Sequence, residues 1–194
     1  MKEVEILISF DDTKEEILEK LSKFKFAGEK EIYDTYYVDE LRDNLKPEAD
    51  LRMNEIFRVR RIGDDCLITY KKNNFEGKRW IYSDEYETTA KDYKMVEKIV
   101  EMLGLKDQVV VHNKRKVYKH NEYEIVLEEV EDLGLFIEVE IIISDDKEDV
   151  IEVKEKIRQF INELGLKNVR ELNVGKNQLL LSKKLNRNDL EIYI

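Results

Sequence analysis

The sequence is poor in the residues that cross-link a chain or interrupt it. Its 194 residues include one cysteine, Cys66, and one proline, Pro47. A lone cysteine can form no disulfide within the chain and cannot build a cysteine zinc site, so a reducing, cytoplasmic setting is expected. The two histidines, His112 and His120, have no helix-spaced partner, and we expect neither of them to act in catalysis.

Long apolar runs and an excess of positive charge are also missing. No segment approaches the roughly 20 apolar residues that a membrane helix needs, and residues 1–5 open a strand pattern rather than a signal peptide. The formal net charge is −10, whereas general nucleic-acid binding relies on basic patches. We therefore expect neither a membrane nor a nucleic acid as partner, and an anion site must be local and enclosed.

The chain does contain a regular succession of strand and helix patterns, at a length that suits one domain. Alternation of polar and apolar side chains predicts strands at residues 2–10, 31–39, 57–60, 67–71, 79–88, 109–119, 122–129 and 135–143. Apolar stripes predict helices from a capping box at Thr13 to Gly28, over 91–103 and over 144–164. Residues 40–54 are predicted to form an excursion and residues 72–78 a loop, and the tail after Glu171 has apolar patches.

The hairpin predicted around residues 57–71 collects positive charge on one face. Because strand side chains alternate, Arg58 and Arg60 share a face, and Lys71 joins them from the second strand. Like charges at close range repel one another unless an anion lies between them. This hairpin therefore predicts an anion-binding site.

The other strands have the same polarity, with a charged face and an apolar face that an amphipathic helix can cover. The charged members are Glu3, Glu5, Arg58, Arg60, Lys71, Arg79, Glu85, Glu87, Arg115, Glu124, Glu128, Glu138 and Glu140. Seven or eight strands with these faces inward predict an α+β protein, a closed β-barrel with a wet interior and helices packed outside. Such an interior is costly unless a polyphosphate and divalent ions such as Mg²⁺ balance its charge. The alternative is that these are ordinary solvated strand faces with cross-strand Glu–Arg pairs.

Several short motifs also follow one another in a specific order. They are Glu3-Val4-Glu5, Asp34-Thr35-Tyr36-Tyr37, Phe57-Arg58-Val59-Arg60, Ile68-Thr69-Tyr70-Lys71, Glu85-Tyr86-Glu87, Lys114-Arg115-Lys116-Val117-Tyr118, Leu127-Glu128 and Gly134-Leu135-Phe136-Ile137-Glu138-Val139-Glu140. Over about residues 1–165 the chain thereby resembles the CYTH family of class IV adenylate cyclases, thiamine triphosphatases and other triphosphate tunnel metalloenzymes. The resemblance implies an antiparallel eight-stranded barrel, a triphosphate tunnel domain over residues 1–170. Residues 171–194 would be an extension that packs on the barrel or on a partner.

The resemblance also implies roles for the charged residues. Those expected to be catalytic and to bind a triphosphate are Arg58, Arg60, Lys71 and Arg115, with Arg79 and Lys114 as further triphosphate-binding residues. Those expected to bind Mg²⁺ or Mn²⁺ are Glu3, Glu5, Glu128, Glu138 and Glu140, with Glu85 and Glu87 in support. The implied partner is a small triphosphate (ATP, thiamine triphosphate or tripolyphosphate), bound by a monomer or a homodimer.

Several positions depart from the family pattern, including Glu128 in place of an aspartate and Ser83 in place of an arginine. Leu7 stands where the opening Glu-x-Glu-x-Lys motif has its lysine, and Asn113 stands where a basic residue is expected two positions before Arg115. Two hypotheses remain open. The first is a metal-dependent enzyme, most similar to a class IV adenylate cyclase that converts ATP to cyclic AMP and pyrophosphate, or to a related triphosphatase. The alternative, motivated by Leu7, is a tunnel that binds polyphosphate or nucleotide without chemistry.

Overall fold

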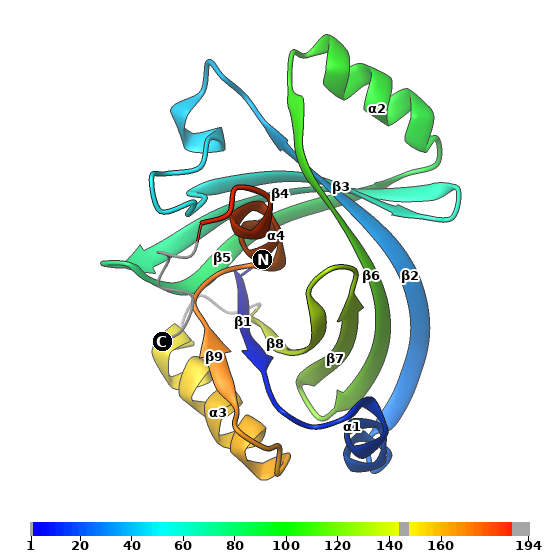
Figure 1. Cartoon of the computed structure of the whole chain (residues 1–194), viewed down its shortest axis with the longest axis vertical. Helices are drawn as coiled ribbons and strands as arrows, with labels where there is room; N and C mark the ends of the chain where they lie inside the picture. The colour runs from blue at the N-terminus through cyan, green and yellow to red at the C-terminus, as the bar shows by residue number, and fades with distance from the viewer. Residues whose placement is uncertain (1, 144–147, 188–194) are drawn as a thin grey trace.

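The computed structural model describes residues 2–143 and 148–187, and its eight antiparallel strands close into a barrel with the helices outside (Figure 1). The barrel strands are β1 (Lys2–Ser9), β2 (Lys25–Val38), β3 (Glu55–Ile62), β4 (Asp65–Glu76), β5 (Arg79–Ala90), β6 (Lys106–His120), β7 (Tyr123–Val130) and β8 (Gly134–Ile143). The remaining elements are α1 (Lys14–Leu21), a short 3₁₀ helix η1 (Asp43–Leu45), α2 (Tyr93–Met102), α3 (Val150–Glu163), β9 (Arg170–Leu172) and α4 (Lys176–Lys184). The predicted α+β barrel is confirmed.

The barrel closes along a seam between β1 and β5. Neighbouring strands follow the order β5-β4-β3-β2-β6-β7-β8-β1, and β1 pairs back with β5 at two positions. Further along the same edge of β1, Leu7 lies opposite Leu172 of β9. Because β5 and β9 share this edge, β1 has strand partners on both sides, as a closed barrel requires.

The largest apolar core lies outside the barrel wall. On β1, the side chains of Val4, Ile6 and Ile8 are buried with Ile17 of α1 and Ile157 of α3. Helix α2 covers a second core on the outer faces of β3 and β4. The alternation predicted for β1 is confirmed, and its charged face is left to line the interior of the barrel.

One end of the barrel is filled by apolar side chains. Leu7, Tyr36 and Phe136, from three different strands, pack there with Leu180 of α4. The amide of Gln178 on α4 donates a hydrogen bond of 3.0 Å to the carbonyl of Leu51, in the excursion between β2 and β3. Helix α4 and this excursion therefore cover the same end.

Two local predictions are wrong. Helix α1 ends at Leu21, and Gly28 lies inside β2, where its φ of 144° coincides with a shift in strand register that glycine tolerates. Residues 72–76 continue β4 instead of forming a loop, because β5 pairs with them up to Glu76. Two predictions lie outside the described residues: the start of the third helix, at residues 144–147, and the last apolar patch of the tail, at residues 192–194. Within the described residues, α3 begins at Val150.

Candidate functional site

A cavity of about 320 Å³ occupies the bore of the barrel, a size at the lower end of small-ligand sites. The cations that line it are Lys30, Arg58, Arg60, Lys71, Arg115 and Lys176, and the carboxylates are Glu3, Glu5, Glu85, Glu87, Glu124, Glu138 and Glu140. Strands far apart in the sequence thus bring their charged faces into one enclosed space. The alternative of ordinary solvated strand faces does not hold for these residues.

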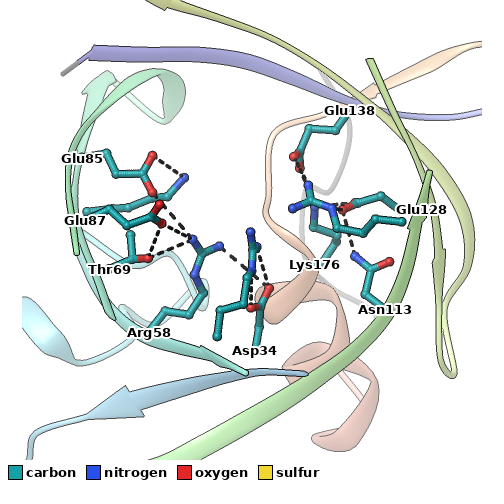
Figure 2. Close-up of polar contacts among 12 residues, drawn as sticks. Asp34, Arg58, Thr69, Glu85, Glu87, Asn113, Glu128, Glu138 and Lys176 are labelled. Atoms are coloured by element: carbon teal, nitrogen blue, oxygen red, sulfur yellow. Dashed lines mark hydrogen bonds and ion pairs between the residues drawn. The ribbon is translucent and has the colours of Figure 1, made fainter. Parts of the chain in front are cut away.

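Arg58 is buried on one wall of the bore with few hydrogen bonds. Only 8% of the residue is exposed, and its guanidinium donates one hydrogen bond, of 3.1 Å, to the hydroxyl of Thr69. Carboxylate oxygens of Asp34, Glu85 and Glu87 lie 3.6–3.8 Å away, and its Nε has no hydrogen-bond partner within the described part of the chain (Figure 2). A guanidinium in this state retains donors for an anion in the bore.

Arg60, two residues further along β3, is held by a buried carboxylate. Its Nε and one terminal nitrogen donate hydrogen bonds of 2.7 and 2.9 Å to the two oxygens of Asp34, which lies opposite it on β2. Burial alone would raise the pKa of Asp34, but the charges of Arg60 and Arg58 outweigh burial and hold this pKa well below its usual range. Asp34 is therefore an anion that orients both guanidinium groups.

The opposite wall carries a second network (Figure 2). Arg115 of β6 forms ion pairs of 2.6 Å with Glu128 and with Glu138. Lys176, the first residue of α4, lies 2.5 Å from Glu128 and also donates a hydrogen bond to Glu138. Burial would raise the pKa of Glu138, yet Lys176 and Arg115 lower it. The chain segment beyond the barrel strands thus supplies one cation of the bore.

Three carboxylates lie close together and outnumber the cations beside them. Oxygen atoms of Glu3, Glu5 and Glu140 lie within 4.8 Å of one another. Burial favours the neutral form of Glu3, but Lys71, at 2.7 Å, outweighs burial and lowers its pKa to about 2. Burial and the neighbouring charge of Glu3 raise the pKa of Glu5, and the same two causes raise that of Glu140 to about 8. An all-oxygen donor set short of positive charge fits a hard divalent cation such as Mg²⁺ or Mn²⁺.

The bore contains most of the residues that the sequence proposed, but three lie elsewhere. Glu128 does not line the cavity, because it is fully buried behind Arg115 and Lys176. Arg79 is half-buried near the start of β5 and does not line the cavity either. Lys114 is exposed on the outer face of β6, since strand alternation turns it away from Arg115. Lys114 is thus not brought to the site.

Sequence reasoning assigned no role to two residues that shape the bore. Asp34 lies inside the motif Asp34-Thr35-Tyr36-Tyr37, so a carboxylate in this strand could have been noticed from the sequence. Its partner Arg60 is known only once the register between β2 and β3 is known. Lys176 is 38 positions from Glu138 and belongs to no periodic pattern. Its role depends on where α4 docks.

Comparisons with known proteins agree with this geometry. A family model described as "CYTH domain" matches residues 1–174. The chain is 30% identical over 182 residues to "Putative adenylate cyclase MJ0240" of Methanocaldococcus jannaschii, covering 93% of this chain and 94% of that one. The structure of the PH1819 protein from Pyrococcus horikoshii is similar with a TM-score of 0.77 and 29% identity, over 93% of this chain and 99% of that one.

A more distant structure shares the fold alone. It is titled "Putative adenylyl cyclase HpAC1 from Hippeastrum reveals a dominant triphophatase activity", with a TM-score of 0.61 and 15% identity, over 99% of this chain and 100% of that one. None of the helices in the described ranges has the length and apolar character needed to cross a membrane.

Proposed function

The chain belongs to the CYTH family, and from this premise we propose that it is a metal-dependent enzyme acting on a triphosphate inside the barrel. The observation that carries the proposal is Arg58, a cavity-lining guanidinium whose three carboxylate neighbours stay at 3.6–3.8 Å and whose terminal nitrogens form one hydrogen bond, to Thr69, among the described residues. A buried cation with unused donors is costly unless an anion completes its hydrogen bonds. A phosphate group in the bore would do so.

We assign the phosphates to the cations on both walls of the bore. Arg58, Arg60 and Lys71 would hold the chain of phosphates from one side, and Arg115 and Lys176 from the other. Guanidinium groups bind phosphate oxygens in pairs, whereas the ammonium groups act as point charges. Asp34 and Glu128, which line no part of the cavity, keep the arginines oriented when no phosphate is present.

We assign the metal to Glu3, Glu5 and Glu140, the carboxylates that lie close together and are short of cations. The cavity lining carries six cations against seven carboxylates. The raised pKa values of Glu5 and Glu140 favour their protonated forms while no metal is bound. With all seven carboxylates ionised, a triphosphate would give the bore an excess of negative charge. Divalent cations would correct this excess of negative charge. When bound, such an ion neutralises phosphate charge and activates the attacking hydroxyl or water.

The reaction we place first is that of an adenylate cyclase. The ribose 3′-hydroxyl of ATP gives its proton to water while its oxygen bonds to the α-phosphorus. The bond from that phosphorus to the bridging oxygen breaks, and pyrophosphate leaves. Arg58, Arg60 and Lys71 would stabilise the charge that builds up on the leaving phosphates. The name of the 30% identical Methanocaldococcus relative supports this order. In a triphosphatase, the second candidate, water attacks instead and the same cations serve the same purpose.

The test is a turnover assay of purified protein with Mg²⁺ or Mn²⁺ against ATP, thiamine triphosphate and tripolyphosphate. Arg58→Met should abolish turnover, whereas Arg61→Met should not. Arg61 is the arginine three positions after Arg58 on β3, and its guanidinium lies over the ring of Tyr33 outside the cavity lining. Binding without product would favour the non-catalytic alternative, and neither binding nor turnover of any triphosphate would overturn the proposal.

A further inference from the structure

We infer that Leu67 and Ile142 bind the organic group of an organic triphosphate at the open end of the bore. Both side chains line the cavity. Its other apolar lining residues, Leu7, Tyr36, Ile56, Phe75 and Trp80, lie towards the end that α4 covers. The inference rests on the proposed function and adds a position for the part of the substrate that is not phosphate.

The two ends of the bore differ in polarity and in access. At one end Leu7, Tyr36 and Phe136 are buried beneath Leu180 of α4, so this end is closed by an apolar layer. At the other end the lining residues remain in contact with solvent. Ile142 is 53% exposed there, and Lys30 is also exposed. A substrate therefore enters, and its bulky group stays, at the end that holds Ile142.

Leu67 lies at the same end as Ile142, as strand pairing shows. Ile142 of β8 lies opposite Glu3 of β1, at the position where β1 meets Ser83 of β5. From there β5 continues to Thr89, which lies opposite Leu67. Both residues thus belong to the end of the barrel where β5 and β8 finish and β4 begins.

Along each of the two strands, the inward-facing residues change from charged to apolar towards the opening. On β4 the order is Lys71, Thr69, Leu67, and on β8 it is Glu138, Glu140, Ile142; the side chains of Lys71 and Glu138 are mostly buried. We place the triphosphate among the buried cations, because the attraction between phosphate and a cation is strongest where both are shielded from water. Its organic group is then left beside Leu67 and Ile142.

The chemistry of these two side chains defines the ligand class. They offer apolar contact and no hydrogen bond, which suits the flat face of a heterocycle or the carbon face of a sugar. Single exposed apolar residues are common on protein surfaces and need no explanation there. Leu67 and Ile142 differ because they face the interior of a charged bore.

The test compares one substrate that has an organic group with one that lacks it. We measure kcat/KM and, by calorimetry, Kd for tripolyphosphate and for whichever of ATP and thiamine triphosphate the wild type accepts. In the variant Leu67→Ser/Ile142→Ser, we expect kcat/KM for the organic triphosphate to fall, and its Kd to rise, by about tenfold or more, which is the scale of a lost apolar contact. For tripolyphosphate, both constants should change less than about twofold. Ile99→Ser is the matched control, since Ile99 of α2 is also 53% exposed but lies outside the cavity lining.

Each outcome decides the matter. Equal losses for both substrates indicate a structural effect and overturn the inference, as does an unchanged constant for the organic triphosphate. A wild type that accepts only tripolyphosphate overturns the inference and leaves the proposed function standing. A wild type that binds no triphosphate overturns the proposed function itself.

Discussion

Replacing Asp34 with asparagine tests whether the cations of the bore depend on buried counter-charges. The Asp34 side chain is 2% exposed, accepts two hydrogen bonds from Arg60 and lies 3.8 Å from Arg58. Asparagine keeps the shape but removes the charge, so both guanidinium groups lose their shared anion. Breaking a buried ion pair costs about 3–5 kcal/mol, and because the Arg60 side chain is 15% exposed and can gain water, we expect a loss near the lower value, about 3 kcal/mol.

The assay is urea unfolding at pH 7, followed by circular dichroism. Asp43→Asn is the matched control, because Asp43 pairs with Lys46 at 3.0 Å but its side chain is 99% exposed, and we expect its midpoint to stay unchanged. Tripolyphosphate should stabilise Asp34→Asn more than wild type, since phosphate then replaces the lost carboxylate. A variant that unfolds at the wild-type urea concentration would refute this account of the bore.

The same substitution has a defined pH dependence. The pKa of Asp34 is lowered in the folded state, so its contribution to stability is complete above its unfolded pKa of about 3.9 and is lost as the pH falls below that value. The stability difference between wild type and Asp34→Asn should therefore narrow progressively between about pH 5 and pH 2. A difference that stays constant over this window would mean that the charge of Asp34 is not the cause.

Three further substitutions address the metal group, α4 and Leu7. Lys176→Met should weaken tripolyphosphate binding, measured by calorimetry, by about tenfold, or 1.4 kcal/mol. Lys184 is an exposed lysine of the same helix, and Lys184→Met should leave the affinity unchanged. Equal affinities for the two variants would show that Lys176 does not bind the phosphates. Glu140→Gln should raise the unfolding midpoint without metal, because the pKa of Glu140 is raised to about 8, so this carboxylate must take up a proton on folding whereas glutamine needs none. The substitution should also reduce the stabilisation by Mn²⁺ in a thermal-shift assay, and unchanged Mn²⁺ stabilisation would contradict the metal assignment. Leu7→Lys should weaken the packing of α4 on the barrel and make α4 more sensitive to proteolysis, because the new ammonium group would lie among Leu172, Phe136 and Leu180. A variant that is stable and has higher turnover would show instead that Leu7 limits catalysis.

The sequence predicted the bore well where its signal was local. Alternation along a strand depends only on neighbouring residues, so the row Glu3, Glu5, Leu7 could be placed on the inner face of β1 without any knowledge of its partners. The same rule accounts for Lys114, which alternation turns outwards beside the inward Arg115. Prediction was poorer at Gly28. A glycine that follows the apolar stripe of a predicted helix usually marks the end of that helix, and no neighbouring residue indicates the irregularity in β2.

By itself, then, the sequence determined which strands exist, which face of each is charged, and that these charges call for an anion. The tertiary structure alone decided which charges meet. Asp34 reaches Arg60 across 26 positions and Lys176 reaches Glu138 across 38, and closure of the bore by α4 determines which end remains open. These pairings depend on strand register and helix docking, and a shift of one residue would turn every inward side chain of a strand outwards.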